Sequence, residues 1–112
     1  LWITGQIIAA ASRAGVITHP EARVSAAAEL VGPVYLGPGV EVAAARLGPN
    51  VCLMPGCRVG VGSRLSDVMM LAGSSMGADC LLEHVVVEEG VALADGVSLQ
   101  GTPERALVAE GQ

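Results

Sequence analysis

The sequence predicts an all-β fold in which short strands and tight corners wind into a coil. The first observation is that an aliphatic residue returns every five or six positions between Leu30 and Leu99. A helix would repeat such a residue every three or four positions, and a single strand every second position. The second observation is that the fifth position of each six-residue unit is again apolar or small. Each unit therefore corresponds to a short strand followed by a corner.

The predicted inward side chains form two columns. The first column consists of Leu30, Leu36, Val42, Leu47, Leu53, Val59, Leu65, Met70, Met76, Leu82, Val87, Leu93 and Leu99. The second column consists of Val34, Val40, Val51, Cys57, Ser63, Ser74, Cys80, Val91 and Val97. Three units, at 42–46, 65–69 and 82–86, have lost one corner residue, and Ala45, Val68 and Val85 continue the inward ladder through them.

Residues that tolerate a positive φ angle recur just before the second inward position. These corner residues are Gly39, Asn50, Gly56, Gly62, Gly73, Asp79, Gly90 and Gly96. Glycine, asparagine and aspartate enter the left-handed region of backbone conformation more readily than other residues. A chain that turns at the same phase in successive units must coil.

Units such as Leu36-Gly37-Pro38-Gly39-Val40-Glu41 and Met76-Gly77-Ala78-Asp79-Cys80-Leu81 resemble the hexapeptide repeat of left-handed parallel β-helix proteins. In that family three units form one triangular coil, and the inward aliphatic side chains stack. The resemblance implies an all-β, left-handed parallel β-helix of roughly four to five coils.

The predicted organisation has three parts, which are an N-terminal helix or linker at 1–15, the β-helix at 16–101 and a C-terminal tail at 102–112. Leu1 to Ala14 lacks the repeat and is rich in alanine and isoleucine, so we expect a short helix that covers the open end of the coil. Pro103 is expected to end strand pairing. Because the sequence does not begin with methionine, we expect it to be a part of a longer or processed protein.

Composition excludes two classes of partner. The net charge is -5 and the sequence has no lysine, whereas binding to nucleic acid or to an anionic membrane needs a basic patch. Cys52, Cys57 and Cys80 are odd in number and lack CxxC spacing, which favours small buried side chains in a reducing compartment over a metal site or a disulfide. With neither a signal peptide nor a membrane-spanning stretch in this sequence, we expect a cytoplasmic location.

A finer resemblance comes from the short units at 65–70 and 82–87, each followed by a full unit with a corner glycine. They resemble the C-terminal β-helix of sugar-1-phosphate nucleotidylyltransferases. The resemblance implies an assembly or regulatory domain of a homo-oligomer, with no catalytic residue and no cofactor of its own. Catalysis with Mg²⁺ would belong to an N-terminal catalytic domain that is missing here.

The run Gly60-Val61-Gly62-Ser63-Arg64-Leu65 matches the phosphate-binding Gly-x-Gly-x-Arg-Leu loop of the catalytic domain in that same family. Here the run lies within the repeat, with Gly62 at a corner and Leu65 in the inward ladder. The family's loop also works with a lysine, which this sequence lacks. The pattern therefore favours an ordinary corner of the coil over a phosphate loop.

Asp67 and His84 are the candidate catalytic residues. They occupy the same place in two short units seventeen residues apart, so their side chains are expected to meet across coils about 4.8 Å apart. A carboxylate beside an imidazole favours its charged form. In hexapeptide acyltransferases a histidine near a coil corner is the general base. The sequence nevertheless favours a solvated or interface histidine over a catalytic base, because aromatic residues are scarce and lysine is absent. Catalysis by His84 and Asp67 is the alternative.

One outward column is apolar and is the candidate interface. It consists of Tyr35, Cys52, Met69 and Val86, with Met54 and Leu71 beside it. Such a stripe is typical of a contact with another subunit. The alternative is that Leu1 to Ala14 folds back over the stripe within one chain.

Three functions are consistent with the sequence. The main prediction is the non-catalytic assembly domain of a nucleotidylyltransferase-like protein. The second is a hexapeptide acyltransferase that transfers acetyl from acetyl coenzyme A to an amino sugar, with His84 as base. The third is a structural scaffold that uses the apolar stripe to oligomerise.

Overall fold

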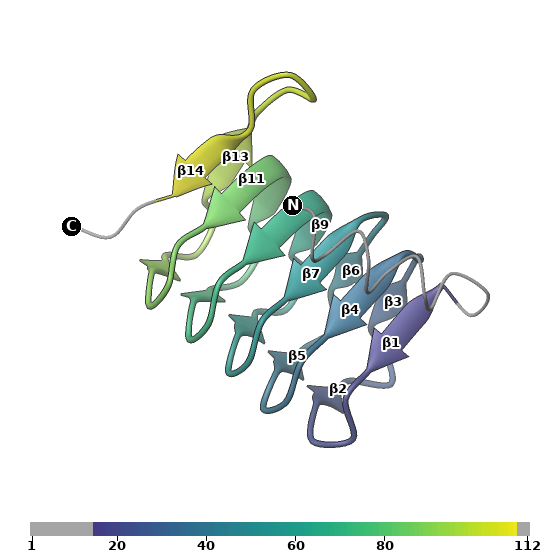
Figure 1. Cartoon of the computed structure of the whole chain (residues 1–112). Coiled ribbons are helices and arrows are strands. Elements are labelled where there is room, and N and C mark those ends of the chain that lie inside the picture. Colours follow the sequence, from purple (N-terminus) through teal and green to yellow (C-terminus); the bar gives the residue numbers. More distant parts are fainter. Residues whose placement is uncertain (1–14, 110–112) are drawn as a thin grey trace.

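A computed structural model describes residues 15–109, which form a parallel β-solenoid of about 5 turns (Figure 1). These residues contain no helix, and the predicted all-β coil is confirmed, with an architecture consistent with a left-handed β-helix. No helix long and apolar enough to cross a bilayer occurs in this part of the chain. The predicted helix or linker at 1–15 lies almost wholly outside the described residues.

The larger of the two sheets covers two sides of the coil. Its two longest strands turn through a corner and so join those two sides into one sheet. All of its strand pairs are parallel. The strands are β1 (Val16–Thr18), β3 (Glu29–Leu30), β4 (Val34–Leu36), β6 (Arg46–Leu47), β7 (Val51–Leu53), β9 (Arg64–Met70), β11 (Leu81–Val87), β13 (Ser98–Gln100) and β14 (Leu107–Ala109).

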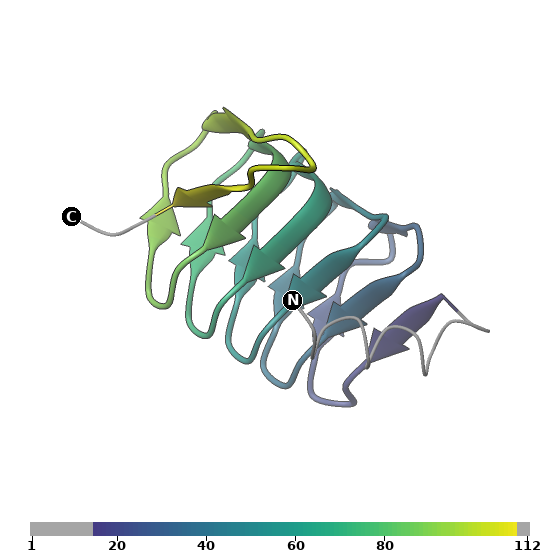
Figure 2. The same cartoon turned by 45° about the horizontal axis from the view of Figure 1, so that its top comes forward.

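The smaller sheet forms the third side of the coil, and each of its strands is two residues long. Viewed from a second direction, the coils stack as parallel layers from one end of the molecule to the other (Figure 2). The strands, in chain order, are β2 (Arg23–Val24), β5 (Glu41–Val42), β8 (Arg58–Val59), β10 (Ser75–Met76) and β12 (Ala92–Leu93).

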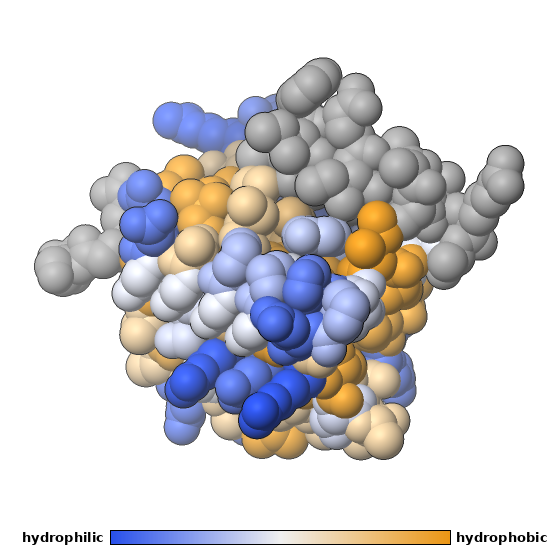
Figure 3. Space-filling view, turned by 60° about the horizontal axis from the view of Figure 1, so that its bottom comes forward, coloured by the Kyte–Doolittle hydropathy of each residue, from blue (hydrophilic) through white to orange (hydrophobic). Residues whose placement is uncertain are grey.

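The interior of the coil is filled by the predicted columns. The first column is buried from Leu36 to Val87 and half-buried at Leu30, Leu93 and Leu99, because end coils have a neighbour on one side only. Ser63 is fully buried, yet its hydroxyl donates to the Gly77 carbonyl at 3.0 Å and accepts from the Cys80 amide at 3.1 Å. Outside, hydrophilic side chains gather at the centre of the face in Figure 3, with hydrophobic ones at its margins.

The corners adopt the predicted conformation. All eight corner residues named above have positive φ, from 56° at Asp79 to 78° at Gly56. The structure adds Asp67 and His84, which both have φ of 53°. The sequence pattern did not predict these two angles, because the short units were expected to have lost their corner residue.

The coil continues beyond residue 101. β14 pairs in parallel with the second half of β11, so the segment at 102–112, for which a tail was expected, contributes a further strand. Pro103 still interrupts pairing, since it lies in a turn that Thr102 and Arg105 close. Strand pairing resumes because Leu107 to Ala109 returns to the register of the coil.

We expect Gly73→Ala to lower the free energy of unfolding by about 1 kcal/mol, because a side chain at φ of 71° is strained. An added Cβ would meet no atom within 4 Å, so the loss reports backbone strain alone. Urea unfolding of the purified chain measures it. Gly73→Asn is the matched control and should lose less; an alanine variant at least as stable as the asparagine variant would contradict the corner conformation.

Candidate functional site

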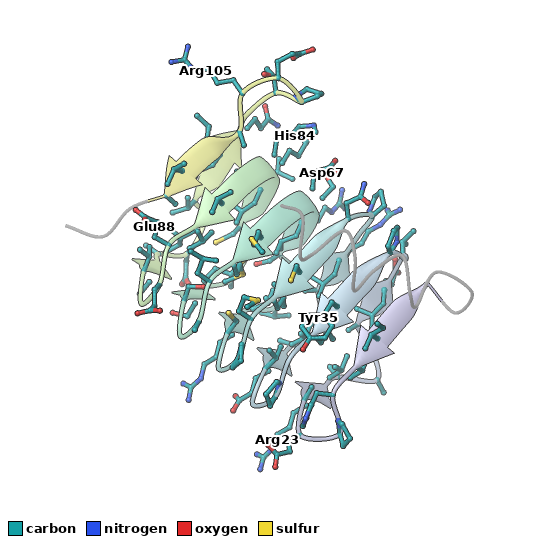
Figure 4. All side chains as sticks on the ribbon, viewed as in Figure 1. Arg23, Tyr35, Asp67, His84, Glu88 and Arg105 are labelled. Carbon is teal, nitrogen blue, oxygen red and sulfur yellow. The ribbon has the colours of Figure 1, made fainter. Side chains whose placement is uncertain are left out.

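Asn50, Asp67 and His84 stand one above another at one corner of three successive coils. The Asn50 Nδ2 donates a hydrogen bond to Asp67 Oδ1 at 2.9 Å. The other carboxylate oxygen, Asp67 Oδ2, lies 3.8 Å from His84 Nδ1. Figure 4 shows Asp67 and His84 side by side on the outside of the coil. The expected juxtaposition of Asp67 and His84 is present, and Asn50 extends it into a row of three polar side chains.

Positive φ angles hold this row in place. Asn50 has φ of 61°, and the two residues above it have φ of 53°. Their backbone is fixed by pairing on both sides, since Val51 pairs with Val68 and Val68 pairs with Val85. An ordered backbone limits the side chains to few positions, which favours a fixed geometry between donor and acceptor.

The orientation of His84 has a chemical consequence. A carboxylate facing Nδ1 favours the tautomer with a proton on Nδ1, which leaves the lone pair of Nε2 available. The side chains of His84 and Asp67 are 26% and 36% exposed, so they are partly shielded and still accessible. The 3.8 Å separation exceeds the length of a normal hydrogen bond. The arrangement can accept a proton from a bound nucleophile.

A loop projects beside His84. In β11 one residue, His84, separates Glu83 from Val85, and these two pair with Gln100 and Leu107. Where the β11 coil has the single residue His84, the last coil therefore has a loop of the residues 101–106. The loop between β13 and β14 projects outward from the C-terminal end of the solenoid (Figure 1).

The loop is ordered at its base. Thr102 and Arg105 exchange backbone hydrogen bonds of 3.1 and 3.0 Å, and the Thr102 hydroxyl accepts from the Arg105 amide at 3.1 Å. Gly101 packs against the His84 carbonyl so closely that a Cβ would clash with it. The repeat pattern did not predict this loop, because the loop follows the last regular unit. The return of apolar residues at Leu107 and Ala109 is the sequence signal that could have indicated it.

The four residues of the predicted apolar stripe lie in one column of the larger sheet. Tyr35, Cys52, Met69 and Val86 are successive cross-strand partners on β4, β7, β9 and β11. Cys52 is only 1% exposed, although strand alternation directs it outward, and the other three are half-buried. Met54 lies beside the stripe, with its Sδ 3.8 Å from Cys52 Sγ. Leu71 is half-buried. The alternative cover, Leu1 to Ala14, lies outside the described residues.

The glycine-rich run at 60–65 forms a corner of the coil. Gly62 has φ of 76°, and Ser63 and Leu65 are buried inside. Backbone amides in this run bond to carbonyls of neighbouring coils, such as Gly62 to Ala44 at 2.8 Å and Arg64 to Cys80 at 2.8 Å. The run is therefore part of the solenoid scaffold, as its position in the repeat predicted.

Cys57 is fully buried, and its Sγ lies 3.4 Å from the Ser74 hydroxyl oxygen. Burial raises the pKa of the Cys57 thiol above its ordinary value of 9.0, with hydrogen bonds to Ser74 and nearby backbone partly opposing the shift. Within residues 15–109 no three histidine, cysteine or acidic side chains are grouped so as to hold a metal ion.

The regular repeat and the parallel solenoid define a hexapeptide-repeat β-helix. No family model matches the chain, and no curated protein is significantly similar to it. Among solved structures, a histidine-to-asparagine variant of perosamine N-acetyltransferase from Caulobacter crescentus, in complex with coenzyme A and GDP-perosamine, is 20% identical, with a TM-score of 0.42. The alignment covers 88% of this chain and 61% of that one.

Two further structures are similar to the chain. A hexapeptide transferase family protein from Anaplasma phagocytophilum is 14% identical over 87% of this chain and 80% of that one, with a TM-score of 0.29. The acetyltransferase domain of PglB from Neisseria gonorrhoeae, in complex with acetyl coenzyme A, is 19% identical over 90% and 62%, with a TM-score of 0.26. None of these three is a nucleotidylyltransferase, and the finer resemblance to that family is not confirmed.

We expect the free energy of unfolding to fall as the pH rises above 9.0, because the thiol of Cys57 ionises at a lower pH in the unfolded chain than in the folded one. The contribution of the protonated Cys57 thiol to the free energy of unfolding is fully present below pH 9.0. It is lost as the pH rises through the pKa that this thiol has in the folded state. Urea unfolding at pH 8 and pH 10 tests this. The Cys57→Ala variant should lose less stability across that interval than the unmodified chain, and an equal loss would contradict the assignment.

Proposed function

We propose that the chain is the β-helix part of a hexapeptide acyltransferase that moves an acetyl group from acetyl coenzyme A to the amine of an amino sugar. The observation that carries the proposal is the approach of Asp67 Oδ2 to His84 Nδ1 at a partly exposed corner. The loop at 101–106 supports it, because it forms a wall beside that corner and offers a surface against which a substrate can bind. The coil resembles that family in its repeat.

The chemistry follows from the two ring nitrogens of His84. Nε2 accepts a proton from the acceptor amine as the amine nitrogen attacks the thioester carbonyl. The carbon–nitrogen bond forms, the carbon–sulfur bond breaks, and the departing thiolate takes the proton back from Nε2. Asp67 stabilises the transient imidazolium through Nδ1, and Asn50 orients Asp67. The reaction takes place outside the coil, since packed side chains fill its interior.

We expect His84→Ala to lower kcat for acetyl transfer by about 10²- to 10⁴-fold, the usual contribution of a general base. Asp67→Asn should cause a smaller loss, because the imidazole remains but its orientation and charge stabilisation are weakened. The assay follows release of free thiol from acetyl coenzyme A in the presence of a panel of amino sugars.

His19→Ala is the matched control. His19 lies in the turn between β1 and β2, where its Nδ1 accepts a hydrogen bond from the Glu21 amide at 3.0 Å, and it is remote in sequence from the proposed site. Its loss should leave turnover unchanged. Full turnover by the His84→Ala variant, or loss of turnover in both histidine variants alike, would refute the assignment.

A second candidate is a non-catalytic assembly domain, the main prediction from the sequence. The observation that favours it is the outward column in which Tyr35, Met69 and Val86 are half-buried, continued on β14 by Val108, which is 53% exposed. An outward apolar column across successive strands is more typical of a subunit contact than of solvent-exposed sheet. The catalytic step would then belong to another domain of the parent protein.

For this candidate we expect light scattering to give the mass of an oligomer, and Val86→Arg to reduce it to that of one chain, because a charge is costly in an apolar contact. Ser98→Arg is the control, since Ser98 is exposed on β13 and lies in another column. An oligomer without acetyl transfer would favour assembly over catalysis. A single-chain mass for the unmodified protein would argue against it.

A further inference from the structure

Two arginines lie side by side on the outer surface, Arg46 and Arg64. Arg46 on β6 and Arg64 on β9 are direct cross-strand partners, and both side chains are exposed. Like charges directly opposite each other destabilise a sheet. Among residues 15–109 neither guanidinium forms an ion pair. The pair therefore concentrates positive charge in a chain whose net charge is -5.

The smaller sheet shows how the same chain separates positive charges elsewhere. There Arg23, Glu41 and Arg58 are successive cross-strand partners, so that an acid lies between the two arginines. Arg58 Nε lies 3.9 Å from Glu41 Oε1. The arginine pair on β6 and β9 has no acid between its two members, although Glu29 on β3 is the cross-strand partner of Arg46 on the other side.

Two hollows in the surface border the arginine pair. One, of about 280 Å³, is also lined by Gly48, Ser66 and Glu83. The other, of about 310 Å³, lies toward Glu29 and Gly62. Both hollows are lined by both arginines. The acids at the margins are Glu29, the cross-strand partner of Arg46, and Glu83, which accepts a hydrogen bond from Gln100 at 3.3 Å.

We propose that Arg46 and Arg64 bind a phosphate or diphosphate group. Guanidinium groups bind phosphate oxygens through paired, charge-assisted hydrogen bonds, and two adjacent arginines present two such forks. The adjacent hollows leave room for the anion and for the molecule that carries it. A bound anion also removes the repulsion between the two cations.

The location connects this anion site with the catalytic corner. Arg64 precedes Asp67 by three residues on β9, so the length of chain between them is at most about 10 Å. The smaller hollow reaches Ser66 and Glu83, the residues next to Asp67 and His84. Resting on the proposed function for this step only, we assign the anion to a phosphate-bearing reactant whose other end reaches His84.

Calorimetric titration with inorganic pyrophosphate at low ionic strength tests the site. The Arg46→Gln/Arg64→Gln double variant should bind pyrophosphate at least about 10-fold more weakly than the unmodified chain, since each charged hydrogen-bond partner contributes to affinity. Arg58→Gln is the control, because it removes a positive charge from an arginine that already faces an acid. Equal affinity in the double variant and the unmodified chain, or an equal loss in Arg58→Gln, would overturn the proposal.

Competition identifies the reactant that supplies the phosphate. Displacement of pyrophosphate by coenzyme A would assign the site to the acyl donor, and displacement by a nucleoside-diphosphate sugar would assign it to the acceptor. Failure of both to compete would overturn the assignment to a reactant. His84→Ala should retain pyrophosphate affinity, so loss of the anion site and loss of the acetyl-transfer function give different results.

Discussion

The parallel stacking of coils seventeen residues apart is the constraint on which the rest of this structure depends. It places equivalent residues of successive coils next to each other, as Asn50 lies beside Asp67. An aliphatic residue then packs on aliphatic residues, and a corner stacks on a corner. The repeat brings polar and charged side chains together in the same way. A row of polar residues or a pair of arginines arises when adjacent coils carry such residues at one position.

The corner that carries Asp67 and His84 differs from the others in its side chains. Elsewhere the positive φ angle is adopted mostly by glycine, which has no side chain to offer. At this corner the same conformation is held by residues that carry an amide, a carboxylate and an imidazole. Asparagine, aspartate and histidine adopt this region more readily than other non-glycine residues, so this corner can carry polar side chains. The strand pairs on both sides hold these residues in place.

Much of the architecture follows from the sequence, because stacking constrains every coil alike. The inward columns and the corner angles at residues such as Asn50 and Asp79 required only the period of the repeat. The pairing of Asp67 with His84 followed from their common phase. The φ angles of those two residues could not be predicted in this way, because a shortened unit was expected to lack a corner residue.

The loop at 101–106 could not be predicted because only the long-range pairing of β14 with β11, and no local pattern, shows where the coil resumes. The burial of Cys52 depends on what packs over an outward position, which strand alternation cannot reveal.

The loop at 101–106 begins and ends on the same strand of the preceding coil, since Gln100 and Leu107 both pair with β11. Its two ends are thus fixed by neighbours that do not depend on what lies between them. Residues can be added to it or exchanged without shifting the register of any strand. The solenoid therefore fixes the register of its strands independently of this segment, whose length can change while the coils on either side of it keep their pairing.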